Sequence, residues 1–169
     1  MKFVSVDPSL SNTAIVWGDI VDGKIVPENW LVVASKKSTA KIPVMQDRLN
    51  RIKDIFAAID EAIEKIKPDV TFGEYPSGSQ SSSASVSLGI SLAILAKLPN
   101  LTAVTPMDVK KVVGKGVISK DDVMDYCTLN YPDFPFEKKK DGTLVKARME
   151  HVADAILIGV AGLKKFKNI

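Results

Sequence analysis

Short runs of alternating apolar and polar residues fill the first part of the chain and predict β-strands. The first run, Lys2 to Val6, stops at Asp7-Pro8, because proline cannot donate a hydrogen bond to a sheet. A second run covers Thr13 to Trp17, and the turn signal Asp22-Gly23 joins it to a third run from Lys24 through about Ala34. The pattern therefore predicts three consecutive antiparallel strands.

Beyond residue 43 the apolar spacing changes to that of helices alternating with short strands. The longest helix is expected from Pro43 to Lys67, and Pro68 ends it. Further helices are expected over 84–97, 107–113, 119–130 and 147–164, and strands over 69–74 and 101–105. This order predicts the α/β class, with a mixed five-stranded sheet flanked by helices. Such an order is typical of the ribonuclease-H-like fold.

Two polar segments and one helix N-cap signal lie between these predicted elements. The segment 77–85 is rich in Ser and Gly and is either a flexible linker or a functional loop; its position just after Glu74 favours a functional loop. The segment 131–146 has no period and carries Lys138-Lys139-Lys140, which indicates a surface loop. Ser119, with Asp122 three residues later, predicts a capped helix start.

Length and composition place the chain among ordinary globular domains. Its 169 residues are expected to form one domain, 1–169, and 46% are hydrophobic and 25% charged. The net charge of +3 is weak support for nucleic acid as a partner. Cys127 is the only cysteine, so no disulfide framework is expected; it is either a nucleophile or a buried structural thiol, and its apolar helical neighbours favour the second. No signal peptide or membrane-spanning run is visible, so a soluble, cytoplasmic protein without membrane association is expected.

Four ionisable residues stand beside apolar segments at remote places in the chain. Asp7 and Glu74 each end a predicted strand, and His151 and Asp154 lie one turn apart on the last predicted helix. Acidic side chains are costly near a core unless a cation compensates them. This combination predicts a divalent-metal site assembled from distant elements, and such a site suggests phosphodiester chemistry.

Four segments in order resemble the RuvC family of Holliday-junction resolvases. They are FVSVDPSLSNTAIVWG, DVTFGEYPSG, VTPMDVKKVVGKGVISKDDV and MEHVADAILIGVAG, and their spacing extends the resemblance over nearly the whole chain. The divergence is more typical of a phage or plasmid member than of a bacterial housekeeping one. The resemblance implies a metal-dependent crossover junction endodeoxyribonuclease that resolves four-way DNA junctions by paired nicks.

The resemblance also implies roles for individual positions. Asp7, Glu74, His151 and Asp154 take the catalytic and metal-binding positions, with His151 either a metal ligand or a residue that orients water. Two Mg²⁺ ions are implied, with Mn²⁺ as a substitute and no nucleotide cofactor. DNA-binding positions are Lys110, Lys111, Lys115, Lys120, Tyr75 and Ser77. Many members have an aromatic residue where this chain has Ser77, and the lysines alone would also suit a solvated face.

A symmetric homodimer is expected, because a junction offers two equivalent strands to cut. The apolar helix from about Ala84 to Lys97 is the expected interface, with Ser91 as a test position; a core helix within the monomer explains the pattern nearly as well. Other functions compete with junction resolution. An actin-like or sugar-kinase-like ATPase needs a longer chain with two lobes, a catalytically inactive DNA-structure binder would not need all four site positions, and a nuclease for forks or flaps stays open.

Overall fold

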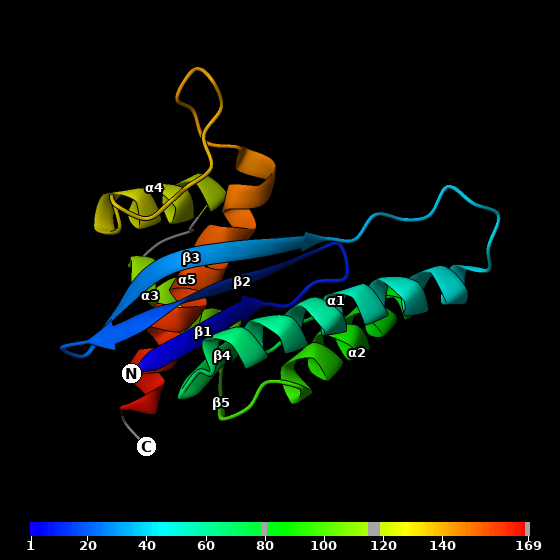
Figure 1. Cartoon of the computed structure of the whole chain (residues 1–169), viewed down its shortest axis with the longest axis horizontal. Coiled ribbons are helices and arrows are strands. Elements are labelled where there is room, and N and C mark those ends of the chain that lie inside the picture. The colour runs from blue at the N-terminus through cyan, green and yellow to red at the C-terminus, as the bar shows by residue number, and fades with distance from the viewer. Residues whose placement is uncertain (79–80, 115–118, 168–169) are drawn as a thin grey trace.

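The computed structural model describes residues 1–78, 81–114 and 119–167, and its elements follow the predicted order. The strands are β1 (Lys2–Asp7), β2 (Asn12–Val21), β3 (Lys24–Ala34), β4 (Val70–Glu74) and β5 (Leu101–Val104). The helices are α1 (Val44–Ile66), α2 (Ser82–Ala96), α3 (Pro106–Val113), α4 (Lys120–Asn130) and α5 (Lys146–Phe166). Figure 1 shows them as a central sheet with helices on both faces.

The strands form one mixed sheet in the order β3-β2-β1-β4-β5. β1 pairs antiparallel with β2 and parallel with β4, so the carboxyl ends of β1 and β4 lie next to each other. Ligands of open α/β sheets bind at such carboxyl ends. The predicted α/β class and the mixed five-stranded sheet are therefore confirmed.

β2 is longer than its predicted end at Trp17, because pairing with β3 continues through a register shift between Trp17 and Gly18. A Cβ atom at Gly18 would overlap the carbonyl oxygen of Val26, so only glycine fits at this irregularity. The sequence pattern ended before this glycine, whereas the strand continues through the register shift to Val21.

Alternation along the strands divides the core into two layers. Val4 and Val6 of β1 pack with α1 and α2 on one face of the sheet. Phe3 of β1 and Phe72 of β4 pack with α5 on the other face, where α3 and α4 also lie. Figure 1 shows α1 and α2 side by side on one side of the strands, and α5 crossing the other.

α5 is the most extensively buried helix, with Met149, Val152, Ile156 and Leu157 all at most 1% exposed. It packs against every strand of the sheet and against α3 and α4, which explains why apolar residues surround it. In the described residues, no helix combines the length and apolar character that crossing a membrane requires.

Capping boxes start both helices that lie between the last strand and α5 in the chain. Ser119 accepts a hydrogen bond from the backbone N–H of Asp122 and starts α4, as predicted. Thr105 and Asp108 form a second box at the start of α3, which the sequence pattern had not indicated. Both reciprocal hydrogen bonds of each capping box are present. They stabilise the first turns of α3 and α4.

Candidate active site

Side chains alternate between the two faces of the sheet along β1 and β4, and this alternation places two acidic residues on the same face. Asp7 shares the face of Phe3, and Glu74 shares the face of Phe72, which is the face that α5 covers. The parallel register pairs Val6 with Gly73, so the next residues, Asp7 and Glu74, end the two strands at the same level. These carboxylates therefore project toward α5 from neighbouring strand ends.

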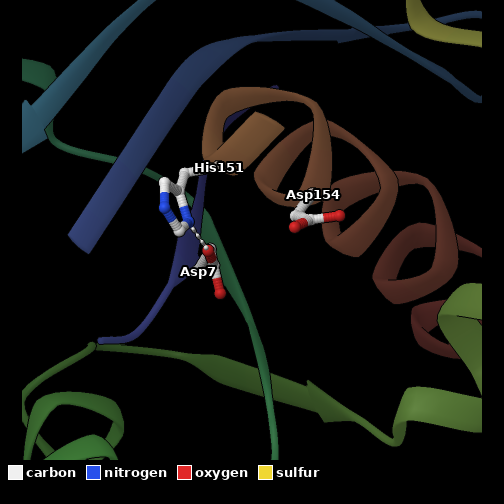
Figure 2. A group of neighbouring side chains, drawn as sticks. All are labelled: Asp7, His151 and Asp154. Carbon is white, nitrogen blue, oxygen red and sulfur yellow. Dashed lines mark hydrogen bonds and ion pairs between the residues drawn. The ribbon is translucent and has the colours of Figure 1, made fainter. Parts of the chain in front are cut away.

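α5 supplies the other two predicted residues. His151 and Asp154 lie one turn apart, and both face the end of β1 (Figure 2). The imidazole Nδ1 of His151 lies 3.2 Å from Oδ2 of Asp7. One ligand atom from each of Asp7, His151 and Asp154 lies within 4.8 Å of the others, a spacing that a single metal ion can bridge.

Glu74 lines the same cavity without joining this tight group. Asp7, Glu74 and Asp154 all border a cavity of about 230 Å³, together with Lys110 and Lys120. The cluster of mutually close ligand atoms contains Asp7, His151 and Asp154 only, among the residues that the structure describes. The structure thus brings all four predicted residues to one site, three of them in ligand contact range and Glu74 on the cavity wall.

The pKa values show that the carboxylates are crowded. Burial, reinforced by the charges of Asp7 and Asp154, raises the pKa of Glu74 to about 7. Burial and the charge of Asp7 likewise raise the pKa of Asp154 to about 6. The hydrogen bond to Asp7 is the main cause that raises the pKa of His151. A concentration of oxygen ligands that lacks sufficient counter-charge fits a hard divalent cation, so the residues suit the expected metal.

Lysines border the mouth of the cavity. Lys110 and Lys120 are exposed and line it, and Lys120 forms a 3.0 Å ion pair with Glu150. The Nε2 atom of His151 lies 3.8 Å from the same Glu150 carboxylate. Glu150 therefore connects the start of α4 to the site helix, a role that the sequence pattern did not indicate because the pair spans two helices.

The remaining predicted DNA-binding residues do not line the carboxylate cavity. Lys111 is exposed on α3, and Tyr75 and Ser77 are exposed in the segment that follows β4. Ser77 lines a different hollow between α1 and α2. Lys115 lies outside the described residues.

Two other sequence predictions have clear outcomes. Cys127 is fully buried, its Sγ lies 3.6 Å from the carbonyl oxygen of Ala153, and burial raises the pKa of its thiol, which suits a structural thiol. Ser91, which the sequence suggested as a position at the dimer interface, is instead buried within the protomer. Ser91 is only 7% exposed and its hydroxyl donates to the carbonyl oxygen of Pro8, because α2 turns this position toward the end of β1.

The sheet order, the flanking helices and the placement of the acidic residues define a ribonuclease-H-like fold. The chain is similar over 99% of its length to RuvC of Thermus thermophilus in complex with a Holliday junction substrate (TM-score 0.68, 19% identity, 94% of that chain). It is also similar to the yeast mitochondrial Holliday junction resolvase Ydc2 (TM-score 0.61, 16% identity, 98% of this chain and 81% of that one).

A viral protein has the same fold. The fowlpox virus resolvase, in a complex with Holliday junction DNA, matches with a TM-score of 0.56 and 13% identity over 98% of this chain and 99% of that one. No protein-family model and no curated protein sequence matches the chain. At these identities the structural matches show a shared fold of the RuvC type, as the sequence resemblance implied.

Proposed function

We propose that the protein is a metal-dependent endonuclease that resolves four-way DNA junctions by paired nicks. The observation that carries this proposal is the group of Asp7, His151 and Asp154 at the end of β1, with Glu74 on the wall of the same cavity. Three solved resolvases with the same fold support it, and two of them are in complexes with Holliday junctions.

Asp7, Glu74, His151 and Asp154 would hold the metal. Their oxygen-rich donor set fits Mg²⁺, with Mn²⁺ as a substitute, and we propose two ions per site. When bound, such ions supply activation of the attacking water and charge stabilisation at the leaving 3′ oxygen.

The lysines have a separate task, which is to hold the DNA backbone. Lys110 and Lys120 stand at the mouth of the cavity, where their ammonium groups would bind the phosphates on either side of the scissile one. Lys111 is exposed on the same helix, α3, but borders a separate hollow, and we propose that it adds to the phosphate contacts. Lys120 is paired with Glu150 in the free protein, and we propose that a DNA phosphate competes with Glu150 for it.

We further propose that the protein works as a symmetric homodimer, since two sites are required for paired cuts. Ile90, Ile94 and Leu95 of α2 belong to the core of the protomer. Leu92 on the same helix is 43% exposed, and a Cβ atom at Gly89 would meet nothing within 4 Å. The exposed side of α2 is therefore the proposed dimer interface. Its other side packs in the core of the protomer, which is the second interpretation that the sequence pattern left open.

The decisive experiment compares four-way junctions with forks and flaps of the same sequence, with Mg²⁺ present. Symmetric paired cuts in the junction, and much slower cuts in the forks and flaps, would support junction resolution. Faster cutting of forks or flaps would instead support the alternative function, a nuclease directed at forks or flaps. Binding of junctions without any cut in Mg²⁺ or Mn²⁺ would leave only a DNA-structure-binding protein.

A further inference from the structure

A second hollow, of about 580 Å³, lies near the carboxyl ends of β1 and β4, on the face of the sheet that α1 and α2 cover. The turn after β1, the start of α1, the segment after β4 and α2 form its walls. Pro8, which follows Asp7 directly, and Pro76, two residues beyond Glu74, both line it. The hollow therefore begins where the two strands that carry the proposed catalytic carboxylates end.

The polar part of the lining of this hollow is cationic and rich in hydroxyl groups, and Leu10, Val44 and Leu88 add apolar surface beside it. Three cationic side chains, Lys37, Arg48 and Arg51, oppose the single carboxylate of Asp47. Serines supply the hydroxyl groups; they are Ser9, Ser11, Ser77, Ser87 and Ser91. We call this hollow the flanking groove and define it by Ser9, Ser11, Lys37, Arg48, Arg51 and Ser77.

The groove is suited to phosphates and unsuited to stacked bases. Guanidinium, ammonium and hydroxyl donors bind phosphate oxygens, and such contacts position a nucleic acid without reading its sequence. Base binding by single-strand grooves depends on aromatic side chains for stacking. Among the described residues, no aromatic side chain lines the flanking groove.

Arg51 gives the groove a fixed wall. Its Nε donates to the hydroxyl of Ser35 at 3.1 Å, and a terminal guanidinium nitrogen donates to the carbonyl oxygen of Leu10, also at 3.1 Å. Asp47 lies 3.7 Å from the same guanidinium group and accepts a hydrogen bond from the backbone N–H of Ser38. These contacts join α1 to the turn after β1 and to the loop after β3, so the wall is held in the free protein.

Asp47 lies within ion-pair distance of Arg51, and Lys37 and Arg48 are the two further cationic side chains of the lining. Lys37 is exposed and Arg48 is partly exposed, so both can reach a ligand in the groove. Lys110 and Lys120 border the carboxylate cavity on the α3 and α4 side. Positive charge therefore stands on both sides of Asp7 and Glu74.

We propose that the flanking groove binds the sugar-phosphate backbone of the DNA strand next to the scissile phosphate, through Lys37 and Arg48, without reading the bases. This inference rests on the proposed endonuclease function. A strand that crosses the site is then held on one side by Lys110 and Lys120, and on the other by the groove.

The test is the salt dependence of junction binding in the Asp7→Asn background, where the DNA stays uncut. The double variant Lys37→Gln with Arg48→Gln is compared with Lys53→Gln with Lys65→Gln, two exposed lysines of α1 that do not line the groove. Each pair removes the same charge. The groove variant is expected to lower the slope of log K against log salt by about two units, and the control pair is expected to leave it unchanged. An unchanged slope in the groove variant, or an equal loss in both pairs, overturns the proposal.

A second measurement locates the contact. Ethylation of phosphates next to the cut is expected to weaken binding of the protein with Lys37 and Arg48 intact, and to have no added effect on the groove variant. Changing the bases at those positions is expected to leave affinity unchanged. If junctions are bound and cut but the groove variant behaves as its control, only the groove proposal fails. If the wild-type chain neither binds nor cuts branched DNA, the proposed function fails and the groove proposal with it.

Discussion

The Nδ1 atom of His151 lies 3.2 Å from Oδ2 of Asp7, although 144 positions separate the two residues along the chain. This contact joins the central strand β1 to α5, the most buried helix, and Asp154 lies one turn further along the same helix. The hydrogen bond to Asp7 is the main cause that raises the pKa of His151. A bound divalent cation would supply the counter-charge that the crowded carboxylates still lack.

The first prediction separates cleavage from binding. Asp7→Asn, Glu74→Gln and Asp154→Asn each remove a proposed metal-binding charge with little change in volume. Cleavage of four-way junctions in Mg²⁺ is expected to fall by orders of magnitude, while junction affinity in Ca²⁺ persists because it depends on lysines and phosphates. Single-turnover cleavage and gel-shift titrations measure the two quantities. A variant that cuts near the wild-type rate removes its residue from the site.

The second prediction concerns stability without metal. The pKa of Glu74 is raised from 4.5 to about 7, so its protonated form is favoured in the folded chain. Its stabilising contribution is complete below pH 4.5 and is lost as pH rises through about 7. In EDTA at pH 8, Glu74→Gln is therefore expected to melt a few degrees above the wild type, on the order of 2–4 °C per kcal/mol.

The pH dependence provides the control for this comparison. Near pH 4 the melting temperatures of Glu74→Gln and wild type are expected to converge, because Glu74 is then mostly protonated in both the folded and the unfolded chain. Mg²⁺ at pH 8 is expected to stabilise the wild type more than the variant. A variant that melts below the wild type in EDTA at pH 8 contradicts the assignment of Glu74 as an insufficiently compensated charge.

The third prediction concerns the basic surface at the mouth of the cavity. Neutralising Lys110, Lys111 and Lys120 to Gln is expected to reduce the salt slope of junction binding by about one unit for each phosphate that these lysines neutralise in the wild type. Glu150→Gln is the informative counterpart, because it releases Lys120 from its 3.0 Å ion pair. We expect this variant to bind junctions more tightly at low salt. Weaker binding in Glu150→Gln would mean that the pair positions Lys120 rather than competing with DNA.

The fourth prediction concerns the dimer. Leu92→Glu places a charge on the exposed side of α2, in contrast to Ser91, which is buried in the protomer. Sedimentation of the wild type is expected to give a mass of about twice 18.3 kDa, and that of the variant the mass of a monomer. The monomeric variant is expected to nick only one strand of the junction. Leu129→Glu on α4, where the leucine is 80% exposed, is the control and should stay dimeric. A wild type that is monomeric both free and on junction DNA contradicts the dimer.

The fifth prediction uses two glycines in helices to test the core. A Cβ atom at Gly162 of α5 would overlap the ring of Phe72, so Gly162→Ala is expected to cost about 1–3 kcal/mol of unfolding free energy. A Cβ atom at Gly89 of α2 meets nothing within 4 Å in the protomer, so Gly89→Ala in the monomeric Leu92→Glu variant is expected to stabilise it by about 0.5–1 kcal/mol. Urea unfolding measures both. Equal effects at the two positions would contradict the close packing of α5 on β4.

Local periodicity was sufficient for much of the fold. Alternating residues identified the strands that end at Asp7 and Glu74, and helical spacing placed His151 and Asp154 on one face of the last helix. These features depend on interactions between near neighbours in the chain, so the sequence pattern carries them directly. The order of elements and the four ionisable residues could therefore be predicted before their arrangement was known.

The tertiary structure decided which of these segments meet. β2 continues past Gly18 because β3 lies beside it, and Ser91 is buried because α2 packs against the end of β1. The pair of Lys120 with Glu150 and the groove around Arg48 likewise join elements that are distant in sequence. Periodicity reports which side of an element is apolar, whereas sheet order and helix packing determine what that side touches. Those long-range contacts bring the candidate site, the nearby lysines and the flanking groove together around the carboxyl ends of β1 and β4.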